Sequence, residues 1–432
     1  MSNYFFQPML GFEQLYTNNT TVNFYSKIFA EMNLSGIREF PRKSDKPTKY
    51  EGRRPFSRHN IYRAFAVMKT QRFRQVSQLL DFLENNIVVA MLCGFEGGRI
   101  PGKDVFYDFL RDTPQSELDS VMIVNTQEMV NLGLVDYENL IVDSMPIFAN
   151  TKLNNPKSFS KSRFNKNQTP AGDSNCKLGV HTASNDNSNK DFDYFWGYKD
   201  HLIIDAKYGL PIFNLTLTAN THDVKAGGEL VSQLASLLSL KGKVKNLIGD
   251  KAFDSNAFYE AIKEILGAKV IAPLRSNAKS QLFDGSIPSC DSGLVMHKCG
   301  HIYRDSGIRF KFTCPFRHSK SKSCPSNHPN FQKSVKNKGC IKYRLIKAAN
   351  LRNCADRDSP TFKALYFKRS AIERYNSRFK FLENEKASVR NKHSVSAIVS
   401  ISHVCLQLTA IVSAKENNFD LIRSMAGLKR TA

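Results

Sequence analysis

No apolar run in this 432-residue chain approaches the roughly 18 to 20 residues that a membrane-spanning helix needs. The N-terminus, MSNYFFQPMLGFEQ, lacks the charged and then apolar pattern of a secretory signal. The nine cysteines include no Cys-x-x-Cys pair, and their odd number fits a reducing compartment better than a disulfide-bonded secreted domain. These absences predict a soluble cytoplasmic protein that does not enter a membrane.

Acidic residues are few, because 39 Asp and Glu oppose 62 Lys and Arg and leave a formal net charge of +23. Such an excess favours polyanionic partners such as nucleic acid, although it does not indicate sequence specificity. Hydrophobic residues make up 41% of the chain and aromatic residues 11%, which indicates globular domains rather than disorder. The length is enough for two or three such domains.

Two of the few aspartates follow short apolar runs that have the character of buried strands. The run Leu140–Val142 ends in Asp143, and the run Leu247–Gly249 ends in Asp250. An acid at the end of a buried strand is unusual as structure but ordinary as a metal ligand, and a turn-capping aspartate is the alternative. Pro146 is expected to end the pairing of the first strand.

The segment Ala364–Glu385 has the period of a helix with one polar and one apolar side. At about 100° per residue, the polar side of a single helix would carry Tyr366, Arg369, Glu373 and Lys380. The apolar residues lie on the neighbouring side, where a core would cover them. A surface helix with ordinary ion pairs is the alternative interpretation, because Arg369 and Glu373 also have the spacing of a simple helical pair.

The same four residues, spaced Tyr-x2-Arg-x3-Glu-x6-Lys, resemble the tyrosine-arginine-glutamate-lysine signature of bacterial insertion-sequence transposases of the DDE type. The resemblance extends from about Leu140 to Lys380. It implies an α/β fold with a ribonuclease-H-like core, in which helices flank a mixed sheet. It also implies a helical N-terminal domain and a mostly β, Cys-rich insert before the last catalytic helix.

In that family three carboxylates hold the metal ions that promote phosphodiester cleavage and strand transfer. The resemblance therefore implies that Asp143, Asp250 and Glu373 are catalytic and metal-binding, with two Mg²⁺ or Mn²⁺ ions per active site. Asp143 would bridge both ions, while Asp250 and Glu373 would each bind one. The remaining residues of the signature would contact DNA, and these are Tyr366, Arg369 and Lys380.

Other segments supply the expected domain organisation. The helical period of Asn60–Leu92 predicts two amphipathic helices, and Ser394–Ser413 predicts one buried helix with too many polar residues to span a bilayer. The expected domains are a helical N-terminal DNA-binding region at 1–135, the first part of the core at 136–275, an insertion subdomain at 276–360, the C-terminal part of the core at 361–415 and a tail at 416–432.

Two strands joined by a turn at Tyr208–Gly209 are expected to form a β-hairpin between the two strand-ending aspartates. This hairpin contains Asp200 and Asp205, which are rival candidates for an acidic site. After the hairpin, Asp254 is expected to be the N-cap of a helix that follows Asp250.

The basic segment Ser276–Ser359 contains six of the nine cysteines together with His301, His318 and His328. A structural zinc site is possible there, but ordinary thiols are the default because regular cysteine spacing is missing. In related transposases the insert packs on DNA, and in some of them a tryptophan stacks on a displaced base. The only tryptophan here, Trp196, lies outside the insert, so that device is absent or another aromatic side chain replaces it.

We therefore expect a DNA transposase that binds the ends of its insertion sequence, cleaves at the element boundary and joins the 3′ ends to target DNA. Double-stranded DNA would be its partner in the bacterial nucleoid, and pairing of two ends predicts a homodimer in the synaptic complex. Double-strand release through a DNA hairpin is a further hypothesis. The open alternatives are a catalytically silent DNA-binding regulator, a metal-dependent nuclease of the same fold and a zinc-dependent binding module.

Overall fold

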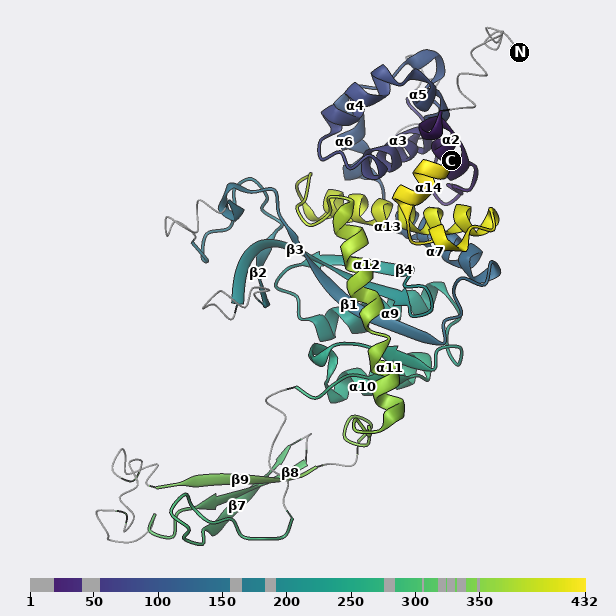
Figure 1. Cartoon of the computed structure of the whole chain (residues 1–432). Helices are drawn as coiled ribbons and strands as arrows, with labels where there is room; N and C mark the ends of the chain where they lie inside the picture. The colour runs from purple at the N-terminus through teal and green to yellow at the C-terminus, as the bar shows by residue number, and fades with distance from the viewer. Residues whose placement is uncertain are drawn as a thin grey trace, which may run out of the picture.

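A six-stranded mixed β-sheet lies at the centre of the molecule between two sets of helices (Figure 1). Its strands are β1 (Asn139–Phe148), β2 (Lys177–Thr182), β3 (Phe192–Asp205), β4 (Pro211–Thr218), β5 (Asn246–Ile248) and β6 (Lys269–Ile271). Neighbouring strands follow the order β2-β3-β1-β5-β6, and β4 pairs with β3. The parallel strands are β1, β5 and β6, whereas β3 is antiparallel to β1, β2 and β4. The fold is therefore mixed α/β, as expected.

The computed structural model describes residues 19–40, 55–155, 165–182, 192–275, 284–304, 307–317, 324, 331, 339–347 and 350–432. Its α-helices are α2 (Thr20–Ala30), α3 (Arg58–Thr70), α4 (Val76–Asn85), α5 (Ile87–Cys93), α6 (Lys103–Asp112), α7 (Gln115–Asn131), α9 (Asp223–Leu237), α10 (Asn256–Leu266), α11 (Pro360–Phe367), α12 (Ser370–Phe381), α13 (Lys392–Lys415) and α14 (Met425–Thr431).

The side chains of β1 alternate between two buried layers, so the strand is apolar on both faces. Leu140 and Val142 enter the core that contains residues of α9 and α10. Ile141 enters the core that contains Ile372 of α12 and the middle of α13. Asp143 has the same parity as Ile141 and therefore faces α12.

Pro146 does not end the pairing of β1, contrary to the sequence prediction. It pairs in register with Lys199, and β1 continues to Phe148. The N–H of Phe148 donates to the carbonyl of Glu385 at 2.9 Å, so even-numbered residues of this strand direct their nitrogens away from β3. The nitrogen of Pro146 therefore points away from β3, on the side where the β1–β3 pairing requires no N–H donor. A proline is tolerated at such a position.

The region Asn60–Leu92 forms three helices rather than the predicted two. The chain bends by 112° between α4 and α5, at Asn86 with φ −128° and ψ 67°. Both helices bury an apolar face in the same core, so the apolar period continues across the bend and does not reveal it. Figure 1 shows α2–α6 stacked on the side of α13 that is remote from the sheet.

The single buried helix expected near the C-terminus is α13, which packs against β4 of the sheet and against α3 and α7. Its composition is apolar enough to cross a membrane, with a mean hydropathy of 1.9, so the expectation of too many polar residues was wrong. The 18-residue apolar stretch of this helix is completely buried within the protein, however, as in a core helix. Its polar side chains are used internally, and the amide of Gln407 donates to the carbonyls of Met122 and Pro211 at 3.2 and 3.0 Å.

A buried chain of polar side chains connects α12, α13 and the sheet. The Tyr375 hydroxyl lies 2.5 Å from Nδ1 of His403, and Nε2 of His403 lies 2.7 Å from Oδ2 of Asp200. The other carboxylate oxygen of Asp200 accepts hydrogen bonds from Asn214 and Thr216. Burial raises the pKa of Tyr375 well above its usual range, so the phenol stays protonated and can donate to His403. Asp200 is thus fully engaged within the core.

The second rival acid, Asp205, organises the predicted β3–β4 hairpin. Its carboxylate accepts hydrogen bonds from the N–H groups of Lys207 at 2.8 Å and of Asp136 at 3.4 Å. Gly209 has a φ of +67°, which closes the turn at little steric cost. Asp205 is completely buried, and this burial raises its pKa to about 6.

The insert contains a separate three-stranded antiparallel sheet, and Figure 1 shows it standing apart from the central sheet. Its strands are β7 (His297–Arg304), β8 (Gly307–Thr313) and β9 (Ile341–Lys347). Cys290 and Cys340 share one small apolar cluster, while Cys314 and Cys324 share another. In the described part of the chain no three metal-binding side chains gather at a zinc site, and His318 and His328 lie outside that part.

Replacing Tyr375 by Phe should destabilise the protein without a change of shape. The substitution removes the partner of the buried Nδ1 of His403, and an unsatisfied buried polar atom costs about 1–3 kcal/mol. Urea denaturation would measure this cost. Tyr107→Phe is the matched control, because Tyr107 is 43% exposed. Equal denaturation midpoints for the two variants would contradict a stabilising role for the buried chain of side chains.

Replacing Asp205 by Asn should change how stability depends on pH. Because the folded-state pKa is raised to about 6, the wild-type carboxyl group favours folding while it is protonated, and this contribution is lost as the pH rises from about 4 through 6. The free energy of unfolding of wild type should therefore fall relative to Asp205→Asn by up to roughly 3 kcal/mol over that interval.

Urea titrations of both proteins at several pH values between 4 and 7 would test the Asp205 prediction. Asp81→Asn, at an exposed position of α4, serves as the control and should run parallel to wild type. A difference between wild type and Asp205→Asn that does not widen with pH would disprove it.

Candidate active site

Two adjacent parallel strands bring Asp143 and Asp250 to the same end of the sheet. Ile141 of β1 pairs with Ile248 of β5, and each aspartate follows its isoleucine by two residues. The two carboxylates are close enough that the charge of Asp250 raises the pKa of Asp143. The structure therefore assembles the two aspartates that the sequence identified in separate apolar runs.

Asp143 is nearly buried, with 15% of its side chain exposed. Burial is the largest influence on its carboxyl group and raises the pKa to about 6, while Arg369 opposes this effect. The side-chain amide of Asn376 on α12 donates to Oδ2 of Asp143 at 3.3 Å. Asp143 is thus a desolvated carboxyl group that is held against α12 by neighbouring polar side chains.

The predicted single helix Ala364–Glu385 is divided into α11 and α12. At the junction the N–H of Arg369 donates to the carbonyl of Tyr366 at 2.9 Å, and the N–H of Ile372 donates to the carbonyl of Arg369 at 3.0 Å. These bonds span three residues rather than four and tighten the helix locally, which changes the direction of the side chains that follow. No proline or glycine marks the junction, so the sequence pattern did not reveal it.

The guanidinium group of Arg369 bridges the candidate acids. Its Nη1 lies 3.0 Å from Oε1 of Glu373, and its Nη2 lies 3.8 Å from Oδ2 of Asp143. Burial disfavours the charged form of Arg369, but the surrounding acidic groups, which include Asp250, raise its pKa overall. Glu373 is 67% exposed, so Arg369 connects a solvent-facing carboxylate with a buried one.

In the described residues, no group of three or more His, Cys, Asp or Glu side chains is arranged to hold a metal ion. The chemistry of the donors around Asp143 nevertheless suits a hard divalent cation, which prefers carboxylate and amide oxygens. Two buried atoms beside Asp143 have no hydrogen-bond partner in the described structure, namely Oδ1 of Asn376 and Nε of Arg369. One is an acceptor for a cation or water, and the other is a donor for an anion.

Tyr366 and Lys380, the other residues of the signature, lie in different surroundings. Tyr366 is partly buried and its ring stacks on Phe362 with centroids 6.4 Å apart. Burial raises the pKa of its phenol, and the charges of nearby acids including Asp250 add to this effect. Lys380 lies in the last turn of α12 and pairs with Glu385 at 3.0 Å. Tyr366 therefore lies close to the candidate acids, whereas Lys380 pairs with a different acidic residue at the end of α12.

Asp254 is not the N-cap of α10, contrary to the sequence prediction. That position belongs to Ser255, whose hydroxyl accepts a hydrogen bond from the N–H of Phe258 at 3.3 Å. Asp254 is instead buried in ion pairs with Arg352 and Arg357. The carboxylate of Asp254 binds two arginines that are distant in the sequence instead of capping the helix. No local sequence pattern could show this.

Sequence reasoning assigned no role to Asn376 or to a polar group on the other face of β1. The spacing of Asn376, one turn after Glu373, could have indicated that it faces the same site. On the opposite face, Oδ1 of Asp223 accepts hydrogen bonds from Ser144 at 2.9 Å and Lys199 at 3.0 Å. This second group fastens the start of α9 to the strand that carries Asp143.

Comparison with known proteins adds independent information about this region. A family model described as a transposase DDE domain matches residues 139–408, a range that includes Asp143, Asp250 and Glu373. No curated protein sequence gave a match. Among solved structures, the chain is similar to the piggyBac transposase in a cryo-EM structure of its synaptic complex with hairpin DNA, with 10% sequence identity and a TM-score of 0.38.

That similarity covers 97% of this chain and 82% of the piggyBac chain, and its TM-score is too low to carry an argument about fold or chemistry. The family match does not have this weakness, because it extends over more than half of the chain and includes both aspartate strands and the glutamate helix. The protein belongs to the transposase DDE domain family.

Proposed function

We propose that this protein is a DNA transposase of an insertion sequence, which cleaves DNA at the element boundary and joins the 3′ ends to target DNA. One observation carries the proposal: Asp143 and Glu373 both pair with the Arg369 guanidinium group and Asp250 lies near enough to act on it, although these acids come from two adjacent strands and a distant helix. All four residues lie within the range that matches the family.

We infer that the central sheet is a ribonuclease-H-like core. The supporting feature is its strand order, in which an antiparallel series of β4, β3 and β1 continues into parallel β5 and β6. In this arrangement the first acid lies on the central strand and the second lies after the neighbouring parallel strand. The proposed core would consist of residues 136–275 and 361–415, with the insertion subdomain at 276–360 between them.

The proposed chemistry depends on carboxylates that would hold two Mg²⁺ or Mn²⁺ ions. Asp143, Asp250 and Glu373 would hold these ions, with Asn376 as an additional oxygen donor close to Asp143. Such ions activate an attacking oxygen and stabilise a leaving oxygen in displacements at phosphorus. The protein's own contribution is to hold two of these acids at the same end of adjacent strands and the third on α12, whose apolar side packs into the core.

Arg369 is proposed to have two uses at the site. In the structure it offsets the mutual repulsion of the acids. Its Nε has no hydrogen-bond partner in the described structure but is buried, so donation to a phosphate oxygen would require the side chain to move toward the solvent. Tyr366 would contact the DNA backbone or stack near the terminal base, since its ring is only partly buried beside the acids.

Double-stranded DNA is the proposed partner, both as element ends and as target. The net charge of +23 supports such a partner, because neutralising phosphates is the main source of affinity for DNA. Pairing of two ends implies a homodimer when DNA is bound. We place this activity in the bacterial nucleoid, and we assign recognition of the ends to the N-terminal helices. A catalytically silent regulator or a metal-dependent nuclease of the same fold is the competing function.

Replacing Glu373 by Gln should abolish cleavage at the element boundary. The substitution keeps the shape of the side chain and removes its charge, so cleavage should slow by at least about a hundredfold. This loss exceeds the one usually seen when a residue that only hydrogen-bonds to a metal ligand is replaced. The assay incubates the protein with DNA carrying the element's own ends, in Mg²⁺ or EDTA. Glu264→Gln, an exposed glutamate on α10, is the matched control and should cleave like wild type.

Product analysis in the same assay separates the competing functions. End binding without cleavage in Mg²⁺ or Mn²⁺ would favour the silent regulator, and cleavage that ignores the boundary would favour the nuclease. Attachment of the ends to target DNA would establish the transposase. Recovery of nicked strands without hairpin ends on a denaturing gel would eliminate the hairpin hypothesis.

Replacing Lys380 by Ala should weaken DNA binding to a similar degree for all sequences. If Lys380 contacts one phosphate, the slope of log affinity against log salt concentration should become shallower by about one. Fluorescence anisotropy at several salt concentrations would measure this slope. Lys363→Ala, at an exposed position of α11, is the control, and equal slopes for the two variants would exclude a specific phosphate contact at Lys380.

A further inference from the structure

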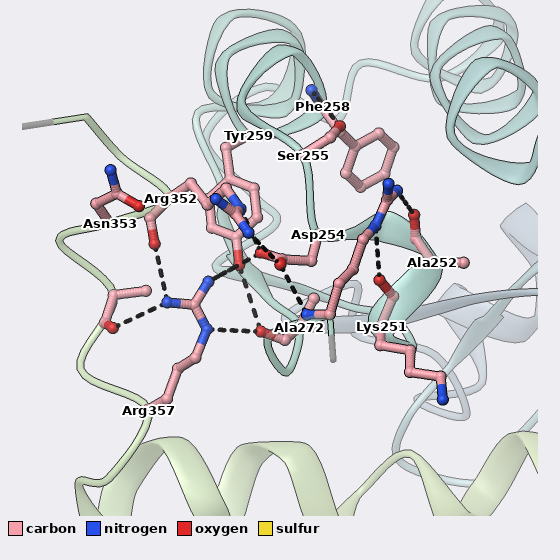
Figure 2. Close-up of polar contacts among 12 residues, drawn as sticks. Lys251, Ala252, Asp254, Ser255, Phe258, Tyr259, Ala272, Arg352, Asn353 and Arg357 are labelled. Atoms are coloured by element: carbon pink, nitrogen blue, oxygen red, sulfur yellow. Dashed lines mark hydrogen bonds and ion pairs between the residues drawn. The ribbon is translucent and has the colours of Figure 1, made fainter. Parts of the chain in front are cut away.

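Both ends of the insert converge on a single buried carboxylate, that of Asp254. The chain leaves the core at Arg275 and returns at Arg352 and Arg357. Figure 2 shows Arg352 and Arg357 approaching Asp254 from the returning segment, while Lys251 and Ala252 lie beside it. The described residues that flank the insert on its two sides are therefore joined at Asp254.

The carboxylate of Asp254 is saturated with donors. Arg352 binds it through two hydrogen bonds, from Nε to Oδ1 at 2.7 Å and from an Nη to Oδ2 at 2.6 Å. Arg357 adds a bond to Oδ1 at 3.1 Å, and the backbone N–H of Arg275 donates to Oδ2 at 3.1 Å. With no exposed side-chain surface and four donors, Asp254 has no oxygen available to bind a metal ion. It is thereby distinguished from Asp250, four residues earlier.

All three nitrogens of the Arg357 guanidinium group donate hydrogen bonds, as both carboxylate oxygens of Asp254 accept them. Its Nε donates to the carbonyl of Ala272, directly after β6, at 3.0 Å. Its remaining nitrogens donate to the carbonyls of Arg352 and Ala355 and to the Tyr259 hydroxyl. A guanidinium group with this many partners cannot move without breaking several bonds at once, so the base of the insert is fixed to the edge of the sheet.

A short 3₁₀-helix, η4 (Lys251–Phe253), connects this cluster with Asp250. Oδ1 of Asp250 accepts a hydrogen bond from the N–H of Ala252 at 2.7 Å. The guanidinium group of Arg275 donates to the carbonyl of Lys251 at 3.2 Å and also to the carbonyl of Ala252. Arg275 therefore holds one side of η4 while Asp250 holds the other, and Asp254 holds the backbone of Arg275.

We propose that Asp254 is a positioning residue of the active site, which acts through Arg275 and η4 to fix Asp250 only while the two ends of the insert are joined. Asp254 thereby makes the geometry of the candidate site depend on the insert. The proposal rests on the proposed function in taking Asp250 as a catalytic acid, but the bonding on which it depends does not.

Hydrogen exchange of the full-length protein, measured by mass spectrometry, tests the positioning directly. In Asp254→Asn, one carboxylate oxygen is replaced by an amide donor that opposes the arginines. The amides of Ala252 and Phe253 should then exchange at least tenfold faster, whereas α13 should exchange as in wild type. Asp358→Asn, at an exposed position of the returning segment, is the matched control and should leave both regions unchanged.

Arg275→Gln supplies a second variant if Asp254→Asn does not fold. It removes the bonds to η4 but leaves the pairs of Asp254 with Arg352 and Arg357 in place. Faster exchange confined to η4 in this variant would support the proposal. Unchanged exchange at η4, or faster exchange spread evenly over the protein including α13, would overturn it.

The metal requirement of DNA cleavage gives a readout that loss of stability alone would not move. In Asp254→Asn the Mg²⁺ concentration for half-maximal cleavage should rise at least fivefold, while affinity for element ends in EDTA stays within twofold of wild type. An unchanged Mg²⁺ requirement would overturn the proposal. Absence of cleavage by wild type would instead refute the proposed function, and the hydrogen-exchange result would still decide the role of Asp254.

Discussion

The repulsion between the nearly buried Asp143 and its acidic neighbour Asp250 is the constraint on which this structure depends. Asp143 is nearly buried and Asp250 is close enough to act on it, whereas the solvent-facing Glu373 pairs with Arg369. A nearly buried carboxylate beside another acid loses hydration and is repelled, so Asp143 requires a positive charge nearby or must take up a proton. Arg369 supplies the positive charge, and Asn376 provides an additional hydrogen bond to Asp143.

The rest of the fold keeps the acids in place against this repulsion. On its far side α12 is fastened by Tyr375, which reaches His403 and through it Asp200. Arg378, nearer the end of the helix, donates to the carbonyl of Gly209 in the hairpin turn at 2.6 Å. The glutamate helix is thereby connected to α13 and to the β3–β4 hairpin. A flexible surface helix would make none of these contacts, so the interpretation of this segment as a simple solvated helix is not supported.

Sequence reasoning succeeded where the decisive pattern was local. The buried apolar run of β1, the glycine turn of the hairpin and the helical period of α13 all depend on residues close together in the chain, and the structure contains each of them. It failed where a distant partner decided the outcome. Asp254 is a residue type that often caps helices and it precedes α10, but it binds arginines about a hundred residues away in the sequence. The break between α11 and α12 and the bend at Asn86 likewise lack any proline or glycine that would mark them.

The sequence by itself determined which chemistry is available. Its scarce acids follow apolar strands, its charge suits DNA, and one helical segment carries a carboxylate flanked by cations. Only the tertiary structure decided which of these groups meet. It placed Asp143 beside Asp250 through strand register, set Arg369 between acids, enclosed Asp200 and Asp205 in the core and joined the ends of the insert at Asp254. The physical reason is that burial and ion pairing depend on distance in space, and residues more than a hundred positions apart become neighbours only when the sheet and its helices pack together.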